Sequence, residues 1–160
     1  DLEVRILPLE ESLLTLLAPD SYSSLHQLRA SRQGQIDSAA SRYGVADPGV
    51  VMVTFFGRAP GVQYDPQNLV LFIRSQLYRP FAILPFTSNF DSRRLEVRQS
   101  AIGLFLFEEP IPVFEGFQVS YGNESSDAWL NKISLLQRER TRVQGRAQGA
   151  LRDTARTPPE

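Results

Sequence analysis

The chain has 160 residues, of which 42% are hydrophobic and 22% are charged, and its formal net charge is −1. It contains no cysteine and a single histidine, His26, which excludes thiol chemistry, thiolate metal sites and multi-histidine metal sites. The near-zero net charge gives no general reason to expect nucleic acid as a partner. These values are typical of one folded domain of ordinary size.

The N-terminal part is predicted to form a strand followed by helices. Residues 2–7 alternate apolar and polar side chains, which predicts a short strand. Residues 10–17 predict a short helix with two acidic residues in its first turn, where the helix dipole favours them. Residues 21–43 predict one long helix, which Gly44 can close and whose thin apolar stripe includes Tyr22 and Leu25. Because so weak a stripe cannot hold a helix alone, this helix has to lie on another surface.

The central part is predicted to be a series of strands between Pro and Gly breaks. Apolar, β-branched and aromatic runs predict strands at residues 50–56, 69–77, 81–86, 95–99 continuing into 101–107, and 117–121. No helical pattern lies between these runs, which favours antiparallel sheets over βαβ units. We therefore expect a mainly β protein, an antiparallel immunoglobulin-like β-sandwich with helical segments at both ends. Without cysteines, only the architecture of the immunoglobulin fold is implied.

The C-terminal part is predicted to be a helix and a basic tail. Ser125, Ser126 or Asp127 can cap a helix whose apolar stripe runs from Trp129 to Val143. Beyond that stripe there is no apolar face, so we expect the tail to fray unless a partner orders it. The predicted divisions are an N-terminal strand and helical extension (1–47), a β-sandwich core (48–123), a C-terminal helix (124–144) and a frayed basic tail (145–160).

Charge is unevenly distributed along the chain. Residues 1–131 carry 10 Arg against 15 Asp and Glu, whereas residues 132–160 carry seven basic side chains against three acidic ones. A basic tail on an acidic body is a candidate docking segment, although a solvated helix face gives the same pattern. The predicted partner-binding residues are Tyr22, Leu25, Trp129, Arg138, Arg140, Arg142 and Arg146.

The histidine and carboxylate residues of this sequence, which are residue types that often catalyse reactions in enzymes, can each be explained by a structural role. His26 has no carboxylate at a known position to orient it as a base, so we expect a structural role. Glu10 and Glu11 lie where a helix begins, and the adjacent Glu108 and Glu109 would point to opposite faces of a strand. The oxygen-rich run 123–127 lacks the spacing of a calcium loop and ends where a helix needs a cap. No catalytic residue, cofactor or metal site is therefore predicted.

Two alternative functions stay open on the sequence. A β-sandwich that binds carbohydrate or lipid would use exposed aromatic residues, for which Tyr64, Tyr78 and Trp129 are the candidates. A hydrolase that uses carboxylates alone would depend on residues such as Glu108 or Asp65, although no pair has a usable spacing.

Two segments, residues 81–87 (FAILPFT) and 119–129 (VSYGNESSDAW), resemble parts of uncharacterised exported bacterial β-sandwich proteins. The resemblance covers about residues 50–143 and includes no diagnostic motif. Some proteins of this kind are accessory subunits of large membrane assemblies, including photosynthetic reaction-centre and antenna complexes. The resemblance thus implies an accessory subunit of such an assembly. Independently, the missing catalytic residues, the weakly amphipathic ends and the basic tail predict a non-catalytic subunit whose partners are other protein subunits, and no nucleic acid is expected as a partner.

The compartment is predicted from the start of the sequence and from its hydropathy. The chain begins at Asp1 without an initiator Met, which predicts a periplasmic or extracellular protein whose signal peptide has been removed; a trimmed sequence or a cytoplasmic protein would look the same. No apolar run approaches the length of a transmembrane helix, so any membrane association is expected to be peripheral and through partners.

Overall fold

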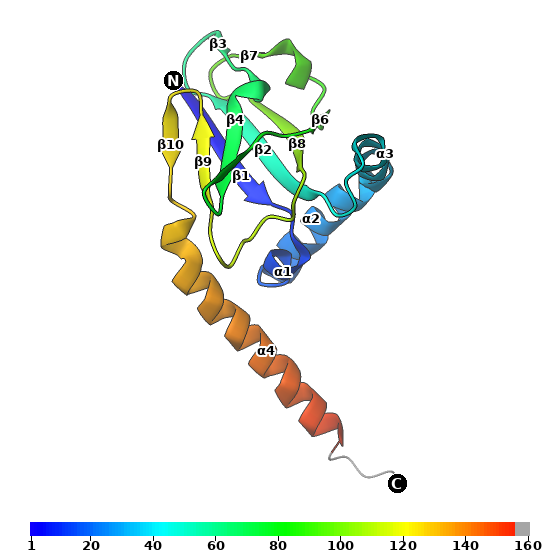
Figure 1. Ribbon diagram of the computed structural model, residues 1–160. Coiled ribbons are helices and arrows are strands. Elements are labelled where there is room, and N and C mark those ends of the chain that lie inside the picture. Colours follow the sequence, from blue (N-terminus) through cyan, green and yellow to red (C-terminus); the bar gives the residue numbers. More distant parts are fainter. Residues whose placement is uncertain (156–160) are drawn as a thin grey trace.

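The computed structural model describes the backbone of residues 1–155 and the side chains of residues 1–152 (Figure 1). The antiparallel sheets are present as expected, but about 38% of the chain is helix and about 31% is strand. The chain is therefore mixed α and β rather than mainly β. The helices at the two ends of the chain together hold more residues than the strands.

The first sheet has four antiparallel strands in the order β1-β2-β8-β6. These strands are β1 (Leu2–Pro8), β2 (Gly49–Gly57), β8 (Ser100–Phe107) and β6 (Ala82–Pro85). The predicted strands at 2–7, 50–56, 81–86 and 101–107 are thus confirmed. The predicted strand at 95–99 is wrong, because Arg98 takes a positive φ of 66° that breaks an extended run. Only β7 (Arg94–Leu95) precedes β8 there, and it pairs with β3 (Val62–Gln63).

The second sheet also has four antiparallel strands, in the order β10-β9-β4-β5. Its strands are β10 (Glu124–Ser126), β9 (Gln118–Tyr121), β4 (Leu69–Ile73) and β5 (Gln76–Tyr78). The single strand predicted at 69–77 is instead a hairpin, because Arg74 and Ser75 both take positive φ, 50° and 66°. Positive φ at both turn residues suits a tight hairpin, because its twist matches that of the flanking strands.

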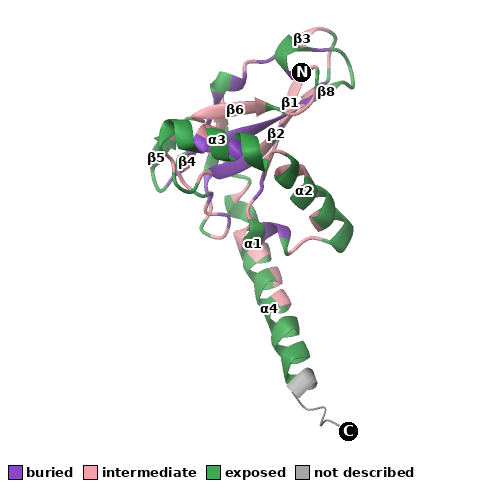
Figure 2. Ribbon diagram, turned by 90° about the vertical axis from the view of Figure 1, so that its right-hand side faces the viewer, coloured by how far each residue is buried: buried purple, intermediate pink, exposed green. Residues whose placement is uncertain are grey.

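Two clusters of buried side chains form the core, one on each face of the first sheet. The larger cluster lies between the sheets and includes Phe55 of β2, Phe105 of β8 and Leu71 of β4. The smaller cluster lies between the first sheet and the N-terminal helices and includes Leu104 and Ile36. Figure 2 shows buried residues concentrated in the strands while the helices are largely exposed. The first sheet is therefore covered on both faces, by the second sheet and by helices.

The N-terminal helical layer contains three helices: α1 (Glu11–Leu14), α2 (Pro19–Ser31) and α3 (Gln33–Tyr43). The single helix predicted at 21–43 is broken at Arg32, whose φ of −109° departs from helical geometry. The poor helix former Gly34 follows this break at once. Gly44 ends α3 in the left-handed region at φ 70°, as a helix cap of this kind requires.

The C-terminal helix begins later in the chain than predicted, and it also ends later. Residues 124–126 form β10, and a short 3-10 turn, η3 (Leu130–Lys132), precedes α4 (Ile133–Ala155). The segment 145–155, which was expected to fray unless a partner orders it, has helical backbone and continues α4. Residues 156–160 of the predicted tail lie outside the described residues. Two further 3-10 turns are η1 (Pro66–Asn68) and η2 (Phe90–Ser92).

Candidate interaction surfaces

The base of α4 is fixed to the body by Trp129. Its indole Nε1 donates a hydrogen bond to the Val113 carbonyl at 2.9 Å, and its ring stacks on Phe117 with centroids 5.2 Å apart. Phe117 is buried in the larger core cluster, and Trp129 packs against that cluster. A stacked aromatic pair with a satisfied indole N–H is a strong anchor. Trp129 therefore fixes the point at which α4 leaves the body.

Gly116 makes room for this attachment. It takes a φ of 91°, and a Cβ at this position would overlap Leu130 Cδ2. Only glycine adopts this backbone conformation at no steric cost. The segment 110–117 can therefore approach η3 closely.

The first turns of α4 rest on Phe114. Gln137 donates a side-chain hydrogen bond to the Phe114 carbonyl at 3.3 Å, and the Arg140 guanidinium lies 4.6 Å from the Phe114 ring centroid. Leu136 packs against the larger core cluster. A cation above an aromatic face is attracted by the ring quadrupole, here in addition to the apolar contact. Arg140, one of the predicted partner-binding residues, therefore already contacts an aromatic ring of the same chain.

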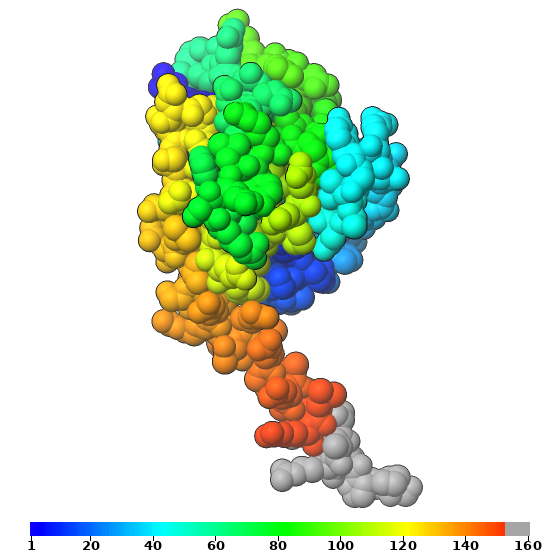
Figure 3. Space-filling view, viewed as in Figure 1, coloured from blue at the N-terminus to red at the C-terminus, as the bar shows by residue number. Residues whose placement is uncertain are grey.

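Beyond Val143 the helix leaves the body. Every described side chain from Gln144 to Arg152 is exposed, and the space-filling view shows the far part of α4 standing clear of the rest of the molecule (Figure 3). The 12 residues from Gln144 to Ala155 extend it by about 18 Å. Of the predicted arginines, Arg142 lies 3.8 Å from Glu139 one turn earlier, and Arg138 and Arg146 are exposed. We call residues 144–155 the projecting segment of α4.

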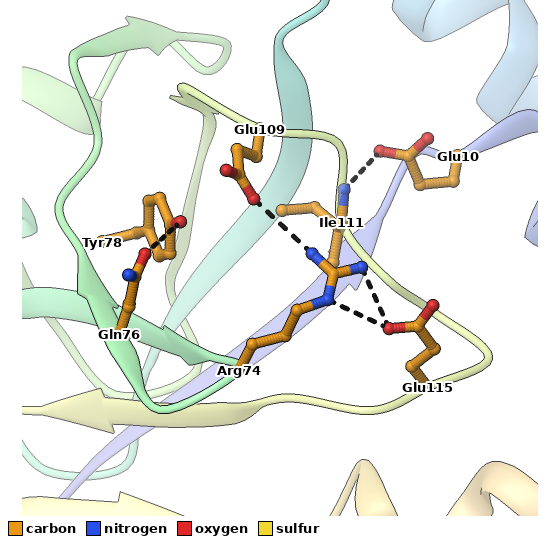
Figure 4. A network of polar contacts seen from close by, with 7 residues as sticks. All are labelled: Glu10, Arg74, Gln76, Tyr78, Glu109, Ile111 and Glu115. Atoms are coloured by element: carbon orange, nitrogen blue, oxygen red, sulfur yellow. Dashed lines mark hydrogen bonds and ion pairs between the residues drawn. The ribbon is translucent and has the colours of Figure 1, made fainter.

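A polar network supports the segment under this helix (Figure 4). Arg74, in the β4–β5 turn, pairs with Glu115 at 2.9 Å and with Glu109 at 3.6 Å. From the other side, the Glu10 carboxylate accepts a hydrogen bond from Ile111 N–H at 3.1 Å. Two separate parts of the chain, the β4–β5 turn and the residue just before α1, thus hold the 109–117 segment, which in turn carries α4.

Glu10 is the carboxylic acid of this network with a shifted pKa. Burial raises the pKa of the Glu10 carboxyl, while the hydrogen bond from Ile111 and the charge of Arg29 oppose that rise. A carboxyl whose pKa is raised by folding stabilises the fold when it is protonated, and this contribution is lost as pH rises through the raised pKa. Ionised Glu10 is therefore a stability cost at neutral pH.

Glu10→Gln is expected to raise the free energy of unfolding at pH 7, because glutamine keeps the acceptor for Ile111 without a half-buried charge. The gain should shrink as pH falls towards the ordinary carboxyl range near 4.5. Urea denaturation at several pH values measures both effects. Glu124→Gln on the exposed strand β10 is the matched control. A Glu10→Gln protein that is less stable than the wild type at pH 7 would contradict the assignment.

A groove of about 860 Å³ lies between β1 and the β9–β10 hairpin with the start of α4. Apolar side chains line it from both sides: Leu2, Val4 and Ile6 from β1, and Val119, Tyr121 and Trp129 from the opposite wall. Charged and hydroxyl groups complete the lining: Asp1, Arg5, Glu124, Ser125, Ser126 and Lys132. Apolar walls combined with placed polar groups are the usual form of a binding site.

The predicted residues Tyr22 and Leu25 lie in a different place from Trp129. The Tyr22 hydroxyl donates a hydrogen bond to the Glu11 carboxylate, and its ring stacks on His26 with centroids 5.3 Å apart. Leu25 packs against the smaller core cluster, beneath the helical layer. The structure thus places Trp129 just before η3 and the arginines on α4, and leaves Tyr22 and Leu25 on the other side of the first sheet.

The remaining candidates from the sequence have structural partners. Tyr64 is buried at 4% exposure and donates its hydroxyl to the Phe90 carbonyl at 2.5 Å. Asp65 caps η1 through Gln67 N–H, and Tyr78 bonds Gln76 in the polar network. Within the described side chains, no group of three or more His, Asp or Glu residues could hold a metal ion. None of the described helices is both long enough and apolar enough to span a membrane.

Sequence reasoning missed Phe114, Gly116 and Arg74, the residues that position α4. The only local signal was a pair of aromatic residues, Phe114 and Phe117, in a segment rich in Pro and Gly. Comparison with protein-family models, curated proteins and solved structures finds no match to this chain.

Proposed function

We propose that this protein is a non-catalytic subunit that docks onto a larger protein assembly through α4. The observation that carries the proposal is a helix fixed at its base by Trp129 whose projecting segment has only exposed side chains among those described. In this proposal the two sheets are a rigid immunoglobulin-like sandwich that presents the helix. A role in the periplasm or outside the cell belongs to the same proposal.

The energetics of the projecting segment support a partner. Isolated helices shorter than about 12–15 residues are marginal in water. Gly145 and Gly149 each weaken the segment by about 1 kcal/mol relative to alanine. Because the body does not bury the described side chains there, packing against another molecule is the available source of stability for this helix.

Charge indicates the chemistry of the partner. The described side chains of α4 include five arginines (Arg138, Arg140, Arg142, Arg146 and Arg152) and one acidic residue, Glu139. A surface of one sign favours a partner of the opposite sign and speeds association. The partner is therefore an acidic protein surface.

The double charge reversal Arg142→Glu with Arg146→Glu is expected to weaken binding to the assembly by roughly tenfold or more. In native gels of mild extracts, the wild-type protein should migrate in a large complex and the variant as the free chain. The matched control reverses two exposed arginines of the body, Arg42 and Arg79, and should stay in the complex. Equal migration of both double variants, or a wild-type chain that migrates alone, would contradict the proposal.

A further inference from the structure

The strand β1 has one unpaired edge. Its odd-numbered residues face β2, because Leu9 N–H bonds the Val50 carbonyl, and the Asp1 carbonyl accepts a bond from Arg58 N–H. The backbone groups of Leu2, Val4 and Ile6 therefore point away from β2. Within residues 1–155, none of these three N–H and three C=O groups has a hydrogen-bond partner.

The groove lies directly beside this edge. Leu2, Val4 and Ile6 line one wall, and their side chains also pack against the larger core cluster. Five residues of extended chain are about 17 Å long. The groove volume of about 860 Å³ lies within the range of about 300–1,000 Å³ that ligand pockets span. A strand placed here would bond the free edge and bury alternate side chains against the core.

Charge near this edge restricts the sequence of such a strand. Arg5 and Arg58 both donate hydrogen bonds to the single carboxylate of Glu3, so these three side chains together carry one net positive charge. Within the Arg5–Glu3 pair, Arg5 is the more accessible residue: 65% of its side chain is exposed, against 23% for Glu3. An acidic residue directly opposite Arg5 would form a favourable cross-strand pair.

We propose that the free edge of β1 binds an extended segment of a partner protein as an added antiparallel strand, with alternate apolar residues and an acidic residue opposite Arg5. The opposite wall of the groove is formed by the β9–β10 hairpin and Trp129. A second folded copy would bring its own hairpin into the same space. This inference is independent of docking through α4.

The probe is a labelled synthetic peptide with the sequence of residues 1–8, DLEVRILP. When it pairs antiparallel with Val4 opposite Val4, its own Glu lies opposite Arg5 and its own Arg lies opposite Glu3. Fluorescence anisotropy should show saturable binding. NMR amide exchange should show new protection at Leu2, Val4 and Ile6. The same peptide N-methylated at its central Val lacks a required N–H and should not bind.

Arg5→Glu in the protein is expected to weaken binding of the probe by about tenfold, because an attractive cross-strand pair becomes a repulsive one. The matched control is Arg42→Glu, which should bind the probe as the wild type does.

The proposal is overturned if the probe does not bind, if the N-methylated peptide binds equally well, or if protection appears away from Leu2, Val4 and Ile6. It is also overturned if the protein dimerises and protects these amides without the probe. The Arg142→Glu and Arg146→Glu variant should keep probe binding, which separates this result from the role of α4.

Discussion

Replacing Phe55 with alanine is expected to lower the free energy of unfolding by about 3–5 kcal/mol. Phe55 is 0% exposed at the centre of the larger core cluster. Its ring stacks on Tyr64 at 4.5 Å between centroids and lies 5.8 Å from the Tyr121 ring, so it joins β2 to the second sheet. The variant loses apolar burial and leaves a cavity between the sheets.

The matched control for Phe55→Ala is Phe56→Ala, one residue further along the same strand. Phe56 is only half-buried and faces the opposite side of the first sheet. Urea denaturation followed by fluorescence of the single tryptophan, Trp129, measures both variants. Phe56→Ala is expected to cost about 1 kcal/mol. Equal losses in the two variants would mean that Phe55 does not join the sheets.

Trp129→Ala is expected to lower the free energy of unfolding by about 2–3 kcal/mol and to release the base of α4 from the body. The substitution removes the ring stacked on Phe117 and leaves the Val113 carbonyl without its donor. Circular dichroism in urea measures the stability. Binding to the assembly should also fall, because the helix is no longer held in one orientation.

Trp129→Phe separates the two contributions of the tryptophan. Phenylalanine keeps an aromatic ring on Phe117 but has no N–H for Val113, so it should cost about 1 kcal/mol. Leu135→Ala, at a position 52% exposed on α4, is the surface control and should change stability little. A Trp129→Ala protein as stable as the Leu135→Ala protein would show that the anchor is energetically unimportant.

Regular strands were predictable because buried side chains in a strand give either an alternating or a continuous apolar pattern in the sequence. Val51, Val53 and Phe55 face one cluster while Val50 and Met52 face the other, so β2 gives a continuous apolar run. The β4–β5 hairpin was not predictable in the same way, because its turn uses Arg74 and Ser75 rather than the Asn-Gly or Asp-Gly pair that marks such turns.

The position of α4 could not be derived from the sequence. Its length was missed because the apolar stripe in the sequence ends at Val143, whereas the helical backbone continues to Ala155. Its attachment depends on contacts between Trp129 and residues 113–117, in a segment with no periodicity. The basic arginines were recognised from composition, but only the structure separates Arg140, which lies on Phe114, from the exposed Arg146.

Site-specific photo-crosslinking tests the central claim most directly. A photoreactive amino acid placed at Arg146 in the projecting segment is compared with one placed at Leu77, which is 49% exposed on β5 of the body. In cells that naturally produce the protein, position 146 should give one dominant crosslink to an acidic protein subunit, and position 77 should not. Crosslinks from Leu77 alone, or none from position 146, would contradict docking through α4.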